Sequence, residues 1–386
     1  MESCNSRQTT DWLGVAQVIM SNRSKKTDLQ AVQLSLLNIT EEQAQDLHDV
    51  KVTIDAELDD AFDGFVGNEG AVQRLRTMIK AAKLRSDIKL SRVILLSGPA
   101  SVGKTELAGR VARVLKLPFL MVDGTSVKTR EQLASMIDDT IDGGALNPQS
   151  MGKIGGILTI RLPPMVIFID EFHLVSSPLQ EALLTVTDAN NRTMIVERPI
   201  RRRLNAEHVT FILATTMESK VTNALLTRCD KMELRRYDRD EVALIVQRAH
   251  THINFGLCQM IADASRFTPR EALQIAVNIN DAIAVADSHQ TIDEVVRAVI
   301  RSRGSYLNGI TQRDVTLMRL LADAGRPMSL TAIVGSLHLN TPSELTEVIE
   351  PYLLYRRWIA VTSKGREITR EGREMLRYIE EFERSR

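Results

Sequence analysis

The feature that most constrains this chain is a short loop, Gly98-Pro-Ala-Ser-Val-Gly-Lys-Thr105. Glycines let a backbone turn its N–H groups inward around phosphates, and a loop that opens a helix presents the positive end of that helix to the anion. The apolar run Val93–Leu96 precedes the loop, and Leu107, Val111 and Leu115 follow it at helical spacing. Strand, loop and helix in this order predict a nucleoside triphosphate site. Its predicted binding residues are Gly98, Pro99, Ala100, Ser101, Val102, Gly103, Lys104 and Thr105.

A second motif supplies two carboxylates to the same site. The apolar run Met165–Ile169 is typical of a buried parallel strand, and it ends in Asp170 and Glu171. Groups that bind ligands in such sheets gather at the carboxyl ends of the strands. We therefore expect the Thr105 hydroxyl and Asp170 to hold Mg²⁺, Lys104 to contact the β- and γ-phosphates, and Glu171 to polarise the attacking water. Together the two motifs predict a nucleoside triphosphatase.

Short apolar runs alternate with helical patterns through the middle of the chain, which predicts an α/β domain with a parallel sheet. We expect four regions: a mostly helical amino-terminal extension at 1–56, an α/β domain at 57–236, a helical domain at 237–301 and a carboxyl-terminal domain at 309–386. The expected strands are Val93–Leu96, Phe119–Val122, Met165–Ile169, Thr210–Ala214 and Lys231–Leu234.

Composition limits the class of protein. Lys plus Arg and Asp plus Glu number 49 each, so the chain is not a bulk electrostatic coat for nucleic acid. No apolar run is long enough for a membrane span. Three well-separated cysteines, Cys4, Cys229 and Cys258, predict a cytoplasmic protein with no disulfide framework and no cysteine-based metal site.

The sequence resembles the AAA+ ATPases and, within them, the RuvB family of Holliday-junction branch-migration motors, over about four fifths of the chain, as a divergent paralogue. The resemblance is carried by Phe65–Glu69, Gly98–Thr105, Phe168–His173, Ala214–Thr216, Leu225–Arg228, Phe267–Arg270 and Glu350–Leu354. It implies an AAA+ phosphate-loop domain, a helical lid over 237–301, and ATP with Mg²⁺ as the bound ligands.

The resemblance also implies roles for single residues. Val66 and Gly67 would line the adenine pocket, and Thr215 or Thr216 would be the polar sensor of water and γ-phosphate. Arg270 would be the lid arginine that contacts the γ-phosphate of its own subunit. Arg228 would be the arginine finger that reaches the ATP of the neighbouring subunit. A finger supplied in this way implies a homo-oligomeric ring, a hexamer by analogy with the family, and poor hydrolysis by a monomer.

The last region has the pattern of a winged helix. Three helical segments precede an expected hairpin of Trp358–Val361 with Glu367–Thr369, turning at Ser363–Arg366. The stretch from Tyr355 to Arg377 carries seven basic and three acidic residues. We expect duplex or branched DNA to contact Arg356, Arg357, Lys364 and Arg366, with Arg366 at the wing tip suited to a minor groove. A winged helix that serves only protein contacts is the alternative.

Three segments depart from the family. The extension 1–56 carries Trp12, Val15, Val18 and Ile19 at helical spacing, which suits docking on the ring or on a protein partner. The Gly-rich stretch Asp142–Leu162 suits either a loop that faces a central pore or a disordered surface loop. The segment Arg192–Leu204, where the family carries the hairpin that binds its junction-binding partner, here has the basic tip Arg198–Arg203 and leaves the partner open, protein or nucleic acid.

Three functions are compatible with the sequence. The leading hypothesis is an ATP-driven ring motor that grips duplex or branched DNA. The second is an AAA+ remodeller or nucleotide switch that acts on a protein partner. The third is a low-turnover, nucleotide-gated DNA-binding loader, which the full set of Lys104, Asp170, Glu171, Arg228 and Arg270 disfavours.

Overall fold

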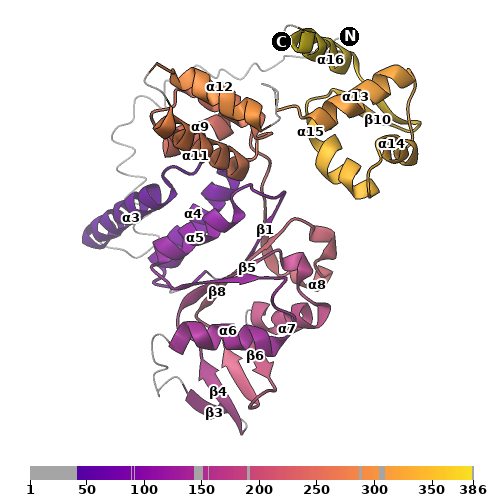
Figure 1. Cartoon of the computed structure of the whole chain (residues 1–386). Coiled ribbons are helices and arrows are strands. Elements are labelled where there is room, and N and C mark those ends of the chain that lie inside the picture. The colour runs from indigo at the N-terminus through magenta and orange to yellow at the C-terminus, as the bar shows by residue number, and fades with distance from the viewer. Residues whose placement is uncertain are drawn as a thin grey trace, which may run out of the picture.

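The computed structural model describes residues 41–384, except 88, 91, 143–150, 155, 189–191, 287–288 and 304–308. Within these residues the chain forms an α/β unit with a second, smaller sheet, then a group of helices, then a small carboxyl-terminal unit (Figure 1). None of the helices in this part of the chain is both long and apolar enough to cross a membrane. Trp12, Val15, Val18 and Ile19 lie outside the described residues.

The central sheet has five parallel strands in the order β2-β5-β8-β1-β9. The strands are β1 (Val93–Ser97), β2 (Phe119–Asp123), β5 (Met165–Asp170), β8 (Val209–Thr215) and β9 (Cys229–Glu233). All five match the strands expected from sequence, although β9 begins two residues earlier than Lys231. Since β1 lies between β8 and β9, the loop after β1 is flanked on both sides by strand ends.

Alternation along these strands builds two separate cores, one on each face of the sheet. Val166 and Phe168 of β5 join one core, whereas Met165, Ile167 and Ile169 join the other. In Figure 1 the helices α3, α4 and α5 cover the first face, and α6, α7 and α8 cover the second. Their bounds are α3 (Glu41–Phe62), α4 (Glu69–Leu84), α5 (Lys104–Leu115), α6 (Arg130–Asp142), α7 (Ser177–Thr187) and α8 (Asn223–Leu226).

A second sheet, in the order β3-β4-β7-β6, contacts α6 and α7 through β6. It consists of β3 (Met151–Ile154), β4 (Ile157–Arg161), β6 (Thr193–Val196) and β7 (Arg202–Asn205). The expectation of a loop over Asp142–Leu162, and with it the disordered alternative, is therefore wrong for 151–154 and 156–162, where β4 pairs with β7 and Ile160 and Leu162 are buried. That this segment faces a central pore stays a prediction. The expected hairpin at Arg192–Leu204 is present as β6 and β7; Arg198–Arg201 of the basic tip lie between the strands, whereas Arg202 and Arg203 lie in β7 and pair with β6.

The helical lid comprises α9 (Arg239–Ala249), α10 (Phe255–Ala264), α11 (Pro269–Val285) and α12 (Ile292–Ser302). Its buried face belongs to the same core as α4, α5 and the first face of the central sheet, the face that α3, α4 and α5 cover. Capping boxes start α9 at Asp238 and α12 at Thr291, since each of these side chains accepts a backbone hydrogen bond at the beginning of its helix. The lid is therefore continuous with the domain that carries the phosphate loop.

The carboxyl-terminal unit is a winged helix with its own core. It contains α13 (Gln312–Ala324), α14 (Leu330–Ser336), a π-helical turn at Glu344–Ile349 that continues as α15 (Glu350–Tyr355), the hairpin β10 (Ile359–Thr362) and β11 (Gly365–Ile368), and α16 (Arg370–Arg384). Thr362 pairs with Gly365, so the turn is only Ser363–Lys364. The expectation that Arg366 lies at the wing tip is therefore wrong, because this residue is inside β11.

Helix α3 attaches part of the amino-terminal extension to the α/β unit. Ile54, Leu58, Ala61 and Phe62 are buried in the core that α4 and α5 share. Asp55 pairs with Lys80 of α4 at 2.6 Å, and Glu57 pairs with Lys83 and, at 3.0 Å, with Lys116. Exposed ion pairs contribute little to the free energy of folding, so the burial of apolar side chains is what mainly holds α3 to the α/β unit.

Leu58→Ala should lower the free energy of unfolding by about 2 to 5 kcal/mol, because Leu58 is 1% exposed and the change leaves a cavity. Val52→Ala on the same helix, at 54% exposure, should change it by less than about 0.5 kcal/mol. Denaturant unfolding followed by circular dichroism measures both. Equal effects of the two substitutions would show that α3 is not part of the core.

Candidate nucleotide site

A cleft of about 720 Å³ lies between the phosphate loop and the lid. It is lined by residues before α4, from the loop and α5, from the end of β5, and from α9 and α11 of the lid. The lining residues are Gly64, Phe65, Val66, Ala100, Ser101, Gly103, Lys104, Thr105, Glu106, Arg110, Asp170, Glu171, Tyr237, Ile245, Arg248, Ala249, Pro269, Arg270 and Leu273. Both sequence motifs thus face one cavity, and the lid arginine Arg270 faces it as well.

The glycines of the loop are required by close backbone approach. A Cβ on Gly98 would lie 2.3 Å from the carbonyl oxygen of Leu234, and one on Gly103 would lie 2.9 Å from the Tyr237 hydroxyl. Gly103 and Ser101 have φ of 90° and 62°, in the left-handed region that turns successive N–H groups inward. Of the predicted binding residues in the loop, Gly98, Pro99 and Val102 are not among the described residues that line the cleft, and Val102 is a core residue under the loop.

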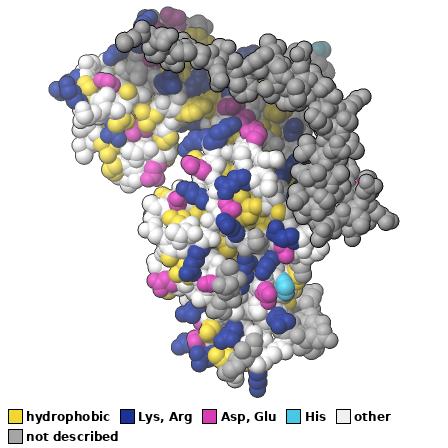
Figure 2. Space-filling view, turned by 180° about the vertical axis from the view of Figure 1, so that it is seen from behind, with side chains coloured by type: hydrophobic (Ala, Val, Ile, Leu, Met, Phe, Trp, Pro, Cys, Tyr) yellow, Lys and Arg dark blue, Asp and Glu magenta, His cyan; other side chains and the backbone are white. Residues whose placement is uncertain are grey.

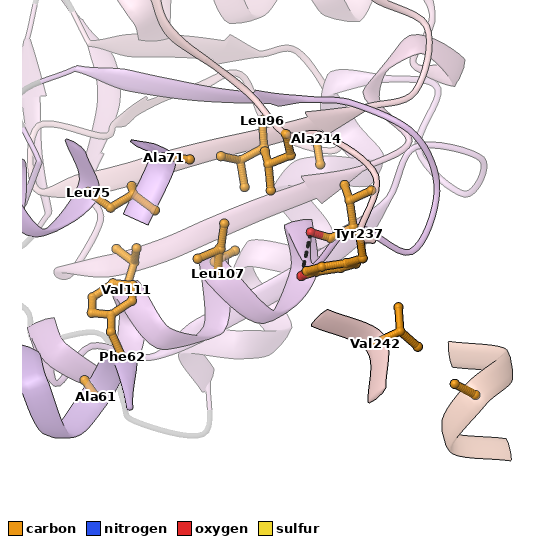
Figure 3. Close-up of a cluster of buried hydrophobic side chains, with 14 of the residues drawn as sticks. Ala61, Phe62, Ala71, Leu75, Leu96, Leu107, Val111, Ala214, Tyr237 and Val242 are labelled. Carbon is orange, nitrogen blue, oxygen red and sulfur yellow. Dashed lines mark hydrogen bonds between the residues drawn. The ribbon is translucent and has the colours of Figure 1, made fainter. Parts of the chain in front are cut away.

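Two side chains that the sequence analysis did not single out hold the loop in place. The Tyr237 hydroxyl donates to the Val102 carbonyl at 3.2 Å, the contact drawn dashed in Figure 3. Burial raises the pKa of Tyr237 to about 12, so the hydroxyl stays protonated and keeps donating. The buried Asn68 accepts from the Arg235 N–H at 2.8 Å. Asn68 lies within the motif Phe65–Glu69, which was assigned only to the adenine pocket, and no charge or motif position marks Tyr237 in the sequence.

Lys104 is buried at the bottom of the loop. Its ammonium donates to the carbonyl oxygens of Gly98 at 2.8 Å and Pro99 at 2.7 Å. Burial lowers the pKa of Lys104, and the charges of Glu171 and Asp170 oppose that shift. A cation held in a low-dielectric site beside N–H donors is a strong attractor for phosphate oxygens.

Thr105 and Asp170 lie together at the edge of the cleft. The Thr105 hydroxyl is 3.2 Å from Asp170 Oδ2, and Asp170 Oδ1 accepts from the Glu171 N–H at 2.9 Å. One hydroxyl and one carboxylate are hard oxygen donors, and Mg²⁺ is commonly held by so few protein ligands together with phosphates and waters. The residues present therefore fit Mg²⁺.

Glu171 occupies a constrained position after β5. Its φ is 43°, a left-handed conformation that is uncommon for a residue with a side chain. Its Oε2 accepts from the Thr216 hydroxyl at 3.1 Å and lies 3.3 Å from Nδ1 of His173. The neighbouring Thr215 is buried, and its hydroxyl accepts from the Met217 N–H at 3.1 Å. The contact to Glu171 favours Thr216 over Thr215 as the polar sensor, although neither residue lines the cleft.

The two predicted arginines lie in different places. Arg270 follows Pro269 at the start of α11, is exposed, and lines the cleft. Arg228 is also exposed but is not among the described residues that line the cleft; its Nη1 donates to the Leu184 carbonyl at 2.8 Å. Arg228 therefore sits outside the cleft.

One part of the cleft lining combines apolar residues with two basic side chains. Phe65 and Val66 line it, and the Arg110 guanidinium lies 5.6 Å from the Phe65 ring centroid and donates to the Ala61 carbonyl at 2.8 Å. Gly67 does not line the cleft; a Cβ there would lie 2.6 Å from Glu241. Arg110 and Arg248 were not predicted as site residues, because only the fold brings them beside the loop. Phe65 was not predicted either, although it begins the motif whose next residue, Val66, was.

Two of the four predicted DNA contacts are engaged inside the protein. Arg366 Nε donates to the buried Glu350 at 2.8 Å. Arg356 lies 4.7 Å from the Trp358 ring centroid and 3.6 Å from Asp263 of the lid. Both guanidiniums therefore have structural partners, which removes the geometric reason for assigning them to DNA.

Arg357 and Lys364 differ from these two, because both are exposed. Figure 2 shows basic and acidic side chains interspersed among the described residues of the face turned away from the view of Figure 1. The described surface in that view has no large area of a single charge sign.

Comparison with protein families matches two parts of the chain. Residues 94–237 match the ATPase family associated with various cellular activities (AAA). Residues 307–377 match the RuvB C-terminal winged helix domain. The two matches cover the phosphate-loop unit and the unit that contains α13 to β11.

Relatives and solved structures extend the similarity across both parts. The Holliday junction branch migration complex subunit RuvB of Campylobacter lari is 30% identical over 315 residues, which are 79% of this chain and 86% of that protein. The RuvB subunit of Thermotoga maritima is 27% identical over 328 residues, or 82% and 91%. The solved Thermotoga maritima RuvB branch migration motor superposes with a TM-score of 0.60 at 25% identity, covering 81% of this chain and 95% of that one.

Tyr237→Phe should weaken nucleotide binding by about 2- to 10-fold, because it removes the shorter of the two side-chain hydrogen bonds to the buried Val102 carbonyl, leaves only the 3.5 Å bond from Asn68 Nδ2, and loosens the loop. Tyr378→Phe is the control, since Tyr378 is 54% exposed on α16. Titration with a fluorescent ATP analogue measures both dissociation constants. Unchanged affinity in Tyr237→Phe would mean that the hydroxyl does not hold the loop.

Proposed function

This chain belongs to the RuvB family of AAA+ ATPases, and from that premise we propose that it is an ATP-hydrolysing ring motor that acts on duplex or branched DNA. The observation that supports this most is the convergence of Lys104, Thr105, Asp170, Glu171 and Arg270 on one cleft. This set supplies phosphate binding, a metal position, a water-orienting carboxylate and a lid cation.

In the proposed reaction, backbone N–H groups of the loop and Lys104 bind the β- and γ-phosphates of ATP. Thr105 and Asp170 would hold Mg²⁺, which supplies charge neutralisation when bound. Glu171 orients the attacking water and accepts its proton, and Thr216 holds that carboxylate. Arg270 contacts the γ-phosphate from the lid, so that closure of the lid excludes water from the site.

The proposed ring follows from the position of Arg228. Phosphoryl transfer spreads negative charge over the γ-phosphate oxygens, and an arginine finger stabilises that charge. Arg228 is exposed and lies outside the cleft of its own subunit. We propose that it completes the site of the next subunit in a ring, with a hexamer by analogy with the family.

The proposed DNA contact lies on the winged helix, at Arg357 and Lys364. The relatives are named for Holliday junction branch migration, which supports a branched substrate as part of the proposal. The residue roles, the Mg²⁺ ligands, the domain limits at 56, 236, 301 and 309, and the cytoplasmic location remain predictions.

A second candidate is an AAA+ remodeller that acts on a protein partner. Ile200 supports it, because this apolar residue at the tip between β6 and β7 is 66% exposed between Arg198 and Arg201. A protein surface with acidic and apolar groups would match such a tip. The third candidate, a low-turnover loader, keeps DNA binding without sustained hydrolysis.

ATP hydrolysis measured without DNA, with linear duplex and with a four-way junction separates these functions. The motor predicts stimulation of at least about fivefold by duplex or junction DNA, since DNA would order the subunits around it. Glu171→Gln, which keeps nucleotide binding but loses the water-orienting carboxylate, is the blank and should show no stimulation. Robust hydrolysis indifferent to DNA would favour the remodeller, and negligible hydrolysis despite tight DNA binding would favour the loader.

The double variant Arg357→Ala with Lys364→Ala should weaken DNA binding equally across sequences and reduce the salt slope by about one to two units, because two phosphate contacts are lost. Arg297→Ala, an equally basic position on α12, serves as the control. Fluorescence anisotropy in a salt series gives the slope. If the slope of the double variant equals that of the parent, the DNA contacts lie elsewhere, most directly at Arg198–Arg203.

A further inference from the structure

Helix α7 lies between the two residues that the proposed mechanism places in different active sites. It begins at Ser177, shortly after Glu171, and its carboxyl-terminal half contacts Arg228 through the Leu184 carbonyl. The segment that joins Glu171 to α7 is itself ordered by backbone bonds, from Leu174 N–H to Glu171 O at 2.8 Å and from Val175 N–H to Phe172 O at 3.1 Å.

Gln180 is a polar residue in the buried face of α7, at 2% exposure. Its Nε2 donates to the Val175 carbonyl at 3.0 Å, and its Oε1 accepts from the Thr222 N–H at 3.0 Å. The two partners fix the orientation of the amide, because a carbonyl needs a donor and an N–H needs an acceptor. Its neighbours on this face of α7, Leu179 and Leu183, are apolar core residues, so an amide here is not explained by apolar packing.

Thr222 is the residue before α8, and a short series of backbone bonds connects it to Arg228. Leu225 N–H donates to the Thr222 carbonyl at 3.0 Å, and Arg228 N–H donates to the Leu225 carbonyl at 2.9 Å. The buried Leu225 packs in the same core as Leu179 and Leu183 of α7. The element that carries Arg228 is therefore fixed to α7 at its start by Gln180 and at its end by Leu184.

We propose that Gln180 is the positioning residue for the arginine finger: it sets the place of α8, and so of Arg228, for the site of the neighbouring subunit. This inference rests on the proposed function, because it needs Arg228 to act across the subunit interface. A buried amide with both partners satisfied holds α8 more strictly than apolar contact does, since a hydrogen bond specifies direction and distance.

Gln180→Met tests the proposal, because methionine has a similar volume and removes both hydrogen bonds. Turnover in the assembled ring should fall by about 10- to 100-fold, since a misplacement of about 1 Å is enough for such a loss. The dissociation constant for ATP should change by less than about threefold. Gln274→Leu, at an exposed position on α11, is the control and should leave turnover unchanged.

Subunit mixing distinguishes the finger from an effect on the variant's own site. A Gln180→Met subunit should keep a functional Glu171 in its own site but present a misplaced Arg228 to its neighbour. Mixing it with Glu171→Gln, whose Arg228 is well placed, should therefore restore turnover. In an equal random mixture about a quarter of the sites then pair a working carboxylate with a well-placed finger. Mixing Gln180→Met with Arg228→Ala should restore nothing, because both lack a finger.

The reverse pattern would overturn the proposal. If Gln180→Met is restored by Arg228→Ala and not by Glu171→Gln, Gln180 acts on Glu171 of its own subunit through Val175. If Arg228→Ala with Glu171→Gln also fails to recover despite demonstrated exchange, the proposed finger between subunits fails instead. Gln180→Glu provides a second variant if Gln180→Met does not fold. It keeps the acceptor for Thr222, so it should retain more turnover than Gln180→Met and be restored by the same partner.

Discussion

Everything in the nucleotide site depends on the contact between the phosphate loop and the chain that leaves β9. Leu234 N–H donates to the Ser97 carbonyl at 2.8 Å, and the Leu234 carbonyl lies where Gly98 has no side chain. The next residues include Arg235, whose N–H donates to Asn68, and Tyr237, whose hydroxyl donates to the loop. Asn68 and Tyr237 hold the loop, and the chain then enters α9 of the lid. Loop, sheet end and lid therefore share one set of contacts, so the cleft between them has defined walls.

Several features of the site are energetically unfavourable, and packing in the surrounding apolar cores offsets them. Lys104 is desolvated, and Glu171 and Ser101 have left-handed backbone. Such features persist only where packing over-determines them. Here two apolar cores cover the central sheet on opposite faces, and both contain residues of β1, β5 and β8. The strand ends are thereby held while the loops beyond them carry the chemistry.

The sheet and the site motifs could be predicted because they depend on local patterns: continuous apolar strands, and glycines at fixed spacing. The strands matched expectation, and Lys104, Asp170, Glu171 and Arg270 do face one cleft. Contacts between distant segments could not be predicted. Charge alone marked Arg356 and Arg366, yet each is bound by a carboxylate, Asp263 and Glu350, from another part of the chain. Short strands at 151–161 also escaped prediction, because their stability comes from pairing with β7.

The turn between α10 and α11 has a mechanical consequence. Arg266 and Phe267 have φ of 53° and 59°; Arg266 pairs with the buried Asp314 of the winged helix, and Phe267 packs 5.8 Å from the Tyr352 ring centroid. Three residues later, Arg270 faces the nucleotide cleft. Because the connection is so short, the residues that contact the winged helix and the residue that faces the cleft cannot move far relative to each other. A rotation of α11 at the cleft would therefore be transmitted to the winged helix through the contacts of Arg266 and Phe267.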